Sequence, residues 1–153
     1  MKKGLPLRLF LARLVRGRQR RGAAAADAPV DLGAWGEERA ADWLRGNGWK
    51  ILGRRVRPNR RDELDIVATR RGVLAFVEVK TRADERIARP AAAVNAAKRH
   101  ALNRAARAFL RQAGAPGLVY RFDIVEVIGR PGAAPPEIRH IENAFPFGRR
   151  SGP

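Results

Sequence analysis

Three carboxylates and a lysine occur in a segment where β-strands would normally place apolar residues. The segment Arg60–Arg82 reads RRDELDIVATRRGVLAFVEVKTR and contains Glu63, Asp65, Glu78 and Lys80. The apolar stretches DIVA and LAFV in this segment are typical of buried strands, in which an unpaired carboxylate is costly. The pattern therefore predicts that the four ionic groups serve a shared site.

A β-hairpin would bring these groups together. A turn at residues 69–72 would place Glu63 opposite Glu78 and Asp65 opposite Phe76. Asp65 would then lie diagonal to Glu78, about 7–8 Å away. Because side chains alternate along a strand, all four ionic groups would share one face of the hairpin.

A divalent cation is the simplest partner for such opposed carboxylates, because like charges at this spacing destabilise a sheet. The chain has no cysteine and two histidines, His100 and His140, which lie far apart in the sequence. A metal site must therefore consist mainly of oxygen ligands, which favours Mg²⁺ or Mn²⁺. We expect Asp65 and Glu78 to hold the ion.

Phosphodiester hydrolysis is the chemistry that this arrangement indicates. The ion would acidify a water molecule and neutralise charge on the phosphate, and Lys80 would orient the water or stabilise developing charge. Glu37 would add a ligand or hold a metal-bound water, and Glu63 would be either an outer partner or the ion-pair mate of an arginine. The alternative is a solvated strand face with a weak Glu–Lys ion pair, which is common in proteins.

Glu37 belongs to an expected helix that starts after Asp31, a good N-cap, and stops at residues 46–48. At about 100° per residue, Glu37 falls on the same stripe as Ala40, Ala41 and Leu44. This carboxylate is therefore expected to point toward the body of the protein.

The remaining pattern predicts a mixed sheet flanked by helices. Expected elements are strands at 49–58, 63–68 and 73–80, a helix at 92–112, a strand at 118–129, and a last strand or tail at 137–145. The order αβββαβ is typical of an α/β fold. We expect one domain over residues 31–146, preceded by a basic extension at 1–30 and followed by a tail at 147–153.

The charge balance favours a polyanionic partner. The chain has 32 Lys and Arg against 15 Asp and Glu, a net charge of +17, and neutralised phosphates release counterions. Nucleic acid is the first expectation, DNA ahead of RNA, with an anionic membrane or the ribosome as lesser alternatives. An arginine-rich composition without functional meaning would produce the same surplus.

The N-terminal extension is the most basic part of the chain. Residues 1–30 contain eight Lys and Arg and one acid, a net charge of +7, and would form either a basic amphipathic helix or an arm without stable structure that adds affinity. No apolar run reaches the ~20 residues of a membrane span, and no secretory signal is apparent. We expect a cytoplasmic protein.

The Asp65…Glu78-Val79-Lys80 pattern resembles the signature of the restriction-endonuclease-like superfamily. The blocks GAWGEERAADWLRGNGWKILGRRVR, DELDIVATRRGVLAFVEVKTR, AVNAAKRHALNRAARAFL, RFDIVEVI and HIENAF resemble the YraN family of bacterial proteins. That family is similar to archaeal Holliday-junction resolvases in its first helix and hairpin. Asp62 departs from the pattern, since the family usually has glycine there, and the basic extension departs from it as well.

The resemblance implies a restriction-endonuclease-like fold and a magnesium-dependent endonuclease. Glu37 would be its helix-borne carboxylate, with Asp65, Glu78 and Lys80 on the sheet. The substrate would be DNA, branched or otherwise structured. The alternative is a nucleic-acid-binding protein that keeps the nuclease-like fold with little or no catalysis.

Three further basic residues are candidates for contact with nucleic acid. Lys98 matches a family position and would contact a phosphate near the metal, or would simply extend its ammonium group to solvent. Arg104 belongs to a helix ridge with Arg107 and Arg111, and Arg82 ends the last strand of the hairpin. Resolvase-like relatives act as dimers, so a homodimer formed through an edge strand is also open.

Overall fold

The computed structural model describes residues 31–84, 94–114 and 118–147 of the 153-residue chain. The elements in chain order are α2 (Leu32–Gly46), β1 (Lys50–Val56), β2 (Leu64–Arg70), β3 (Val73–Arg82), α3 (Ala96–Ala113), β4 (Val119–Ile128) and β5 (Glu137–Phe145). They form a five-stranded sheet in the order β1-β2-β3-β4-β5. Strands β3 and β4 are parallel and the other neighbours are antiparallel. The expected α/β class with a mixed sheet is confirmed, and the C-terminal segment is a fifth strand.

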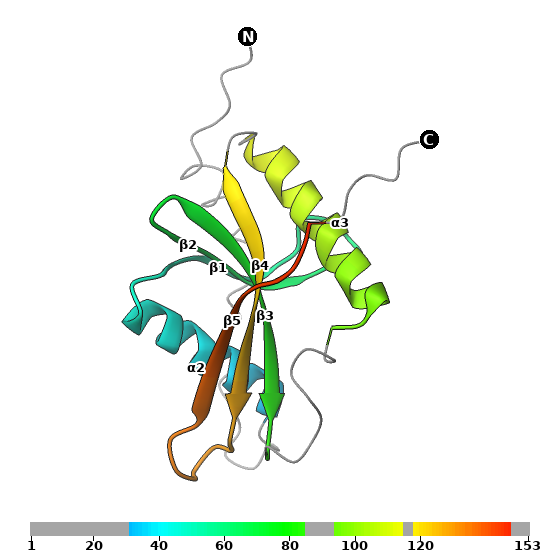
Figure 1. Ribbon diagram of the computed structural model, residues 1–153. Coiled ribbons are helices and arrows are strands. Elements are labelled where there is room, and N and C mark those ends of the chain that lie inside the picture. The colour runs from blue at the N-terminus through cyan, green and yellow to red at the C-terminus, as the bar shows by residue number, and fades with distance from the viewer. Residues whose placement is uncertain (1–30, 85–93, 115–117, 148–153) are drawn as a thin grey trace.

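The two helices cover opposite faces of the sheet (Figure 1). Strand residues of alternate parity serve two separate apolar clusters, as the period of two along a strand requires. The cluster under α2 contains Ala40, Ala41, Leu44, Ile66, Ala68, Ala75, Val77, Val125 and Val127. The cluster under α3 contains Val67, Leu74, Phe76, Leu102, Ala105, Phe109, Phe122 and Ile124. Residues 78 and 80 therefore lie on the α3 face of β3.

Helix α2 begins where the sequence predicted. The Asp31 side chain accepts a hydrogen bond from the Ala34 amide at 3.1 Å, which satisfies one of the free amides at the helix start. Gly36 lets the helix lie directly on β3, since an added Cβ would be 1.8 Å from Thr81 Oγ1. This close packing fixes the position of the next residue, Glu37.

Helix α3 begins later than expected. The sequence suggested a start at residue 92, but within the described residues the helix starts at Ala96, because Asn95 is the N-cap and accepts a hydrogen bond from the Lys98 amide. The preceding Val94 is buried in the core under α3. Gly114 ends the helix in a left-handed conformation with φ of 60°. The cap places Lys98 in the first turn, facing the sheet.

The register of the β2–β3 hairpin differs from the expected one. Arg70 pairs with Val73 and Val67 pairs with Phe76, so the expected pairing of Asp65 with Phe76 is wrong. The turn has two residues, Arg71 and Gly72, both with positive φ, and this tight form suits the twist of a hairpin. The shorter turn shifts the pairing by two residues, a change that sequence alternation alone does not detect.

The packed part of the chain extends through Phe147, whose ring stacks 5.6 Å from that of Phe122 and lies 4.6 Å from that of Tyr120. Within the described residues, no helix has the length and apolarity needed to cross a membrane. The basic extension at residues 1–30 lies outside the described residues.

Candidate active site

The hairpin brings Asp65 and Glu78 together. The observed pair Ile66–Val77, continued by one residue, puts Asp65 directly across from Glu78 rather than diagonal to it. Asp65 Oδ2 accepts a hydrogen bond of 2.9 Å from the Val79 amide, so its carboxylate reaches β3 beside Glu78. Glu78 is only 3% exposed. Two carboxylates therefore face each other in a largely buried place.

This arrangement has an electrostatic consequence for Asp65. Burial, followed by the negative charge of Glu78, raises the pKa of Asp65 from 3.8 to about 7. The Val79 amide and the Lys98 ammonium group oppose the rise, and Glu37 adds a small contribution to it. Near neutral pH, Asp65 is therefore ready to gain or lose a proton according to the positive charge placed beside it.

Two ammonium groups neutralise Glu78. Lys80 Nζ donates to Glu78 Oε1 at 2.8 Å. Lys98 Nζ, from α3, lies 3.1 Å from Glu78 Oε2, but this buried oxygen has no aligned hydrogen-bond donor. The contact is an ion pair without a directed hydrogen bond, so Oε2 keeps unused capacity to accept a ligand. Lys98 thus reaches Glu78, and its contact with a phosphate stays a prediction.

Glu37 is held by an arginine. Arg55 donates through Nε to Glu37 Oε2 at 2.7 Å and through its Nη2 to Oε1 at 3.2 Å, and this hydrogen bond is the main cause that raises the pKa of Arg55. The Glu37 side chain is 14% exposed, which confirms that it points toward the protein body. Arg55 has φ of 48°, which is uncommon outside glycine. Glu37 is therefore bound to Arg55 and makes a small charge contribution to the raised pKa of Asp65.

Glu63 and Asp62 also have arginine partners. Glu63 pairs with Arg57, which is the ion-pair alternative that the sequence left open. Asp62, where the resemblance leads us to expect glycine, is buried and binds Arg104 at two points, 2.9 Å and 2.6 Å. That contact is the main cause that lowers the pKa of Asp62. Arg104 is therefore occupied by an internal partner and is no longer a favoured contact for nucleic acid.

Arg82 has a partner that the sequence analysis missed. Arg82 Nη2 lies 3.4 Å from Oε1 of Glu126, a residue that is 1% exposed. In the register of the parallel strands β3 and β4, Glu126 is the neighbour of Lys80. Glu126 thus extends the ionic row onto β4. The signal was present in FDIVEV, where an acid interrupts a run of apolar residues.

A second ionic cluster occupies the α2 face. Asp123 is fully buried and contacts His140 Nε2 at 2.8 Å and the Asn143 amide at 2.9 Å. Trp43 and Trp49 pack edge-on against the His140 ring. These contacts join β4 and β5 where their pairing shifts between Phe122 and Ile124. The cluster stabilises an irregular strand pair on the face opposite Glu78.

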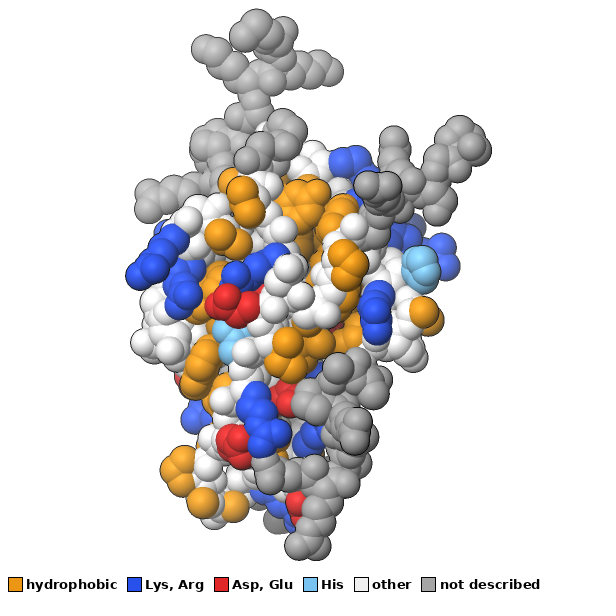
Figure 2. All heavy atoms as spheres, in the orientation of Figure 1, with side chains coloured by type: hydrophobic (Ala, Val, Ile, Leu, Met, Phe, Trp, Pro, Cys, Tyr) orange, Lys and Arg blue, Asp and Glu red, His pale blue; other side chains and the backbone are white. Residues whose placement is uncertain are grey.

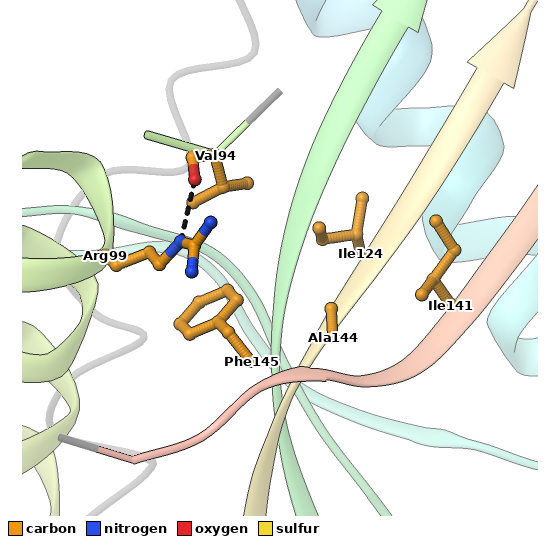
Figure 3. A pocket seen from close by; sticks show the side chains of 6 residues that line it. All are labelled: Val94, Arg99, Ile124, Ile141, Ala144 and Phe145. Atoms are coloured by element: carbon orange, nitrogen blue, oxygen red, sulfur yellow. Dashed lines mark hydrogen bonds between the residues drawn. The ribbon is translucent and has the colours of Figure 1, made fainter. Parts of the chain in front are cut away.

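A small pocket lies between the start of α3 and strands β4 and β5 (Figure 3). It has a volume of about 50 Å³ and is lined by Val94, Arg99, Ile124, Ile141, Ala144 and Phe145. Ile124 pairs with Glu78 across strands β3 and β4, and Arg99 follows Lys98 on α3. The Arg99 guanidinium group donates to the Val94 carbonyl at 2.8 Å. One side of the pocket is therefore formed by this charged side chain, and the other lining side chains are apolar.

The carboxylate oxygens of Asp65 and Glu78 suit a hard cation, whereas those of Glu37 are bound to Arg55. Among residues 31–84, 94–114 and 118–147, no group of three carboxylate or imidazole side chains is arranged to hold one ion. Asp65 and Glu78 offer two carboxylates, and Mg²⁺ commonly uses only one or two, together with water and phosphate. Glu78 Oε2 has no hydrogen-bond donor, and burial and the charge of Glu78 raise the pKa of Asp65. Both features are expected of two neighbouring carboxylates that bind a cation. The pair fits such an ion, whereas Glu37 would first have to leave Arg55.

Comparison with known proteins supplies the family. The model of the uncharacterised protein family UPF0102 matches residues 36–127. The chain belongs to UPF0102. A UPF0102 protein of Symbiobacterium thermophilum is 43% identical over 114 residues, which cover 74% of this chain and 95% of that protein. A UPF0102 protein of Koribacter versatilis is 45% identical over 123 residues, 78% of this chain and 83% of that protein.

The UPF0102 match covers the whole candidate site. Residues 36–127 include Glu37, the Asp65–Glu78 pair, Lys80 and Lys98. Membership agrees with the resemblance drawn from the sequence blocks. The family description assigns no activity, so function has to be argued from the side chains themselves.

Proposed function

We propose that this UPF0102 protein is a divalent-cation-dependent nuclease that hydrolyses phosphodiester bonds in DNA, including branched or otherwise structured DNA. The observation that carries the proposal is the pair formed by half-buried Asp65 and buried Glu78, with Lys80 hydrogen-bonded to Glu78. A pair of carboxylates beside a lysine is typical of phosphodiester hydrolysis with Mg²⁺ or Mn²⁺. The net charge of +17 supports a polyanionic substrate.

Asp65 and Glu78 would hold the ion. A bound Mg²⁺ or Mn²⁺ would neutralise charge on the phosphodiester and make a nearby water molecule more acidic. A cation beside Asp65 would favour its ionised form, because the added positive charge would offset the burial and the repulsion from Glu78 that raise the pKa of Asp65. The Val79 amide keeps the Asp65 carboxylate oriented toward β3.

Lys80 and Lys98 would contribute positive charge to the substrate. Both ammonium groups now neutralise Glu78, and a cation at Glu78 would make one or both of them available. Lys80, on the strand itself, would stabilise the charge that develops on the phosphate. Lys98, which is 37% exposed in its side chain, would contact a phosphate at the rim of the site.

The arrangement of elements supports the proposal. The order of elements is α2-β1-β2-β3-α3-β4, and the charge of Glu37 on α2 contributes weakly to the raised pKa of Asp65, in keeping with the resemblance to the restriction-endonuclease-like superfamily and to archaeal Holliday-junction resolvases. A direct role for Glu37 in holding the ion would require Arg55 to release it. Such a release would give the site an additional carboxylate when substrate binds.

A second candidate function follows from the internal ion pairs. Glu78 has two lysine partners and Glu37 has Arg55, so every carboxylate of the site except Asp65 is already neutralised. A protein with this arrangement could bind nucleic acid through its excess positive charge without hydrolysing it. This binding would be as strong with EDTA as with Mg²⁺.

The decisive experiment compares two glutamate substitutions. The purified full chain is incubated with Mg²⁺ or Mn²⁺ and with duplex, flap, four-way-junction and single-stranded DNA. Glu78→Gln is expected to lower cleavage by about 100-fold or more, whereas the exposed Glu142→Gln is expected to retain it. Equal cleavage by the native chain and the Glu78→Gln chain would identify a contaminant and reject the nuclease. Tight binding without cleavage in either cation would favour the second function.

A further inference from the structure

Arginines are concentrated at the end of β1 and in the connection from β1 to β2. Five of the eight residues from 54 to 61 are arginines, and all five are exposed: Arg54, Arg55, Arg57, Arg60 and Arg61. Basic side chains are spread over the face of the molecule seen in Figure 2, where acidic side chains are fewer. The segment 54–61 is unusual because two of its arginines, Arg55 and Arg57, contact Glu37 and Glu63.

The five arginines fall into two groups. Arg55 and Arg57 are bound to Glu37 and Glu63. In contrast, no carboxylate among the described residues forms an ion pair with Arg54, Arg60 or Arg61. We call these three residues the arginine surface. Their guanidinium groups keep five donors each for an external anion.

The backbone that bears the arginine surface is well supported. Asn59 Oδ1 accepts hydrogen bonds of 2.8 Å from the amides of both Arg61 and Asp62. The Pro58 carbonyl accepts one of 2.6 Å from Gln112 Nε2 on α3. The two-point contact of Asp62 with Arg104 adds a further attachment to the same helix. A fixed backbone lowers the entropy cost of binding, so these arginines are preorganised for a ligand.

The arginine surface adjoins the candidate site. Arg54 pairs with Ile66 and Val56 pairs with Leu64 across β1 and β2, so the β1 backbone, at the edge of the sheet, runs next to Asp65, while the Arg54 side chain shares the α2 face with Ile66. A polymer with regularly spaced phosphates could therefore contact the site and the arginine surface at the same time, whereas a single phosphate group could not.

Protection of an exposed sheet edge is the competing explanation. Charged residues on an edge strand prevent pairing with other chains, and β1 is at the edge of the sheet. This accounts for Arg54, which lies on the strand. Arg60 and Arg61 follow the strand in the connection and have no edge to protect, so edge protection explains only part of the surface.

A lipid surface is the less suitable polyanion. Binding to a membrane surface needs apolar side chains that enter the interface next to the basic ones. Among the described residues, the exposed large hydrophobic side chain is Val119, at the start of β4, away from segment 54–61. The arginine surface offers charge and hydrogen-bond donors without an apolar anchor.

We propose that Arg54, Arg60 and Arg61 bind the sugar-phosphate backbone of a nucleic acid that lies across β1 toward Asp65 and Glu78. The identity of the polyanion rests on the proposed function, but the contact itself requires no hydrolysis. Guanidinium groups suit this role because they match phosphate oxygens in two-point contacts.

The test measures binding of the full chain to fluorescein-labelled junction and duplex DNA by anisotropy, in EDTA, over about 50 to 200 mM salt. A triple substitution of Arg54, Arg60 and Arg61 to Gln is expected to lower the slope of log affinity against log salt by about 2–3, since each phosphate contact contributes about 0.9. The matched control removes the same charge from exposed arginines elsewhere, Arg45, Arg71 and Arg130, and is expected to change the slope by less than about 1. Replacement of the three surface arginines by Lys is expected to retain most of the slope, and thermal unfolding of each variant reports folding.

Equal losses in the two triple variants would show that only net charge matters and would overturn the proposal. So would a surface variant that loses affinity for vesicles of anionic lipid while keeping its DNA affinity. Because binding is measured without a divalent cation, a failure of DNA cleavage leaves this result unaffected. If the binding experiment overturns the role of the arginine surface, the cleavage experiment with Glu78→Gln still stands.

Discussion

Asp65 and Glu78 face each other across the β2–β3 hairpin, and, after burial, the charge of Glu78 is the largest cause that raises the pKa of Asp65 to about 7. Asp65 stays in this position because its carboxylate accepts the Val79 amide. Positive charge near the pair is therefore favourable, and an ionised Asp65 without added positive charge lowers the stability of the fold.

Stability should fall as the pH rises through the range in which Asp65 ionises. The unfolded pKa is near 4 and the folded pKa is about 7, so the folded chain binds the proton more tightly. The resulting stabilisation is fully present below about pH 4 and is lost as the pH approaches 7. Asp65→Asn should remove about 2 kcal/mol of this decline between about pH 5 and pH 8, as measured by urea unfolding.

Divalent cations give the same measurement a second arm. Mg²⁺ should stabilise the native chain at pH 8 and should have much less effect on Asp65→Asn, because one of the two carboxylates is gone. Parallel pH profiles for the native and Asn chains would contradict the electrostatic argument. Equal stabilisation of both chains by Mg²⁺ would contradict a cation site at Asp65 and Glu78, but would leave the electrostatic argument standing.

Lys98 and Lys80 should be coupled through Glu78. Either lysine can compensate the buried carboxylate while the other is present, so Lys98→Met alone should lower the unfolding free energy by about 1 kcal/mol. Replacing both lysines by Met should cost more than the sum of the single changes, since Glu78 would then be buried without a cation. In a Glu78→Gln background the coupling should vanish. Additive effects in the presence of Glu78 would rule out the shared contact.

Asp62 should control stability in acid. Arg104 lowers the pKa of Asp62, so its stabilising contribution is present above about pH 4 and is lost as the pH falls further through the folded pKa. Asp62→Asn should lower the melting temperature at neutral pH and flatten the acid branch of the profile. Arg104→Gln should have the same effect, and the double variant should be no worse than either single one. A melting temperature unchanged in both would show that the contact contributes nothing.

Gly36 should be intolerant of a side chain. A Cβ there would lie 1.8 Å from Thr81 Oγ1 and 2.8 Å from Thr81 Cβ, so Gly36→Ala should cost about 1–3 kcal/mol by forcing α2 away from β3. Gly46→Ala is the matched control, since a Cβ at Gly46 meets nothing within 4 Å, and it should be neutral or slightly stabilising. The shift of α2 should also disturb the pair of Glu37 and Arg55. Equal effects at the two glycines would mean that the close contact is not rigid.

Much of the fold could be predicted from local sequence. The N-cap at Asp31, the breaker at Gly114 and the alternation around Ile66 and Val77 indicated the helices and strands, because these signals act between near neighbours. The hairpin register was missed because Arg71 takes a positive φ, and the four-residue turn fitted the alternation equally well. The start of α3 was missed because alanines before Asn95 have high helix propensity and mask the cap.

The sequence by itself determined the chemical inventory of the site: two central carboxylates, a lysine two residues from one of them, no thiol, and an excess of positive charge for a polyanion. Only the tertiary structure decided which of these groups is already neutralised. Glu37, Glu63 and Asp62 each met an arginine, whereas Asp65 was left beside Glu78. The physical reason is that Coulomb energy depends on distance and burial, and pairs such as Asp62 and Arg104, 42 positions apart, become neighbours only when the chain has folded.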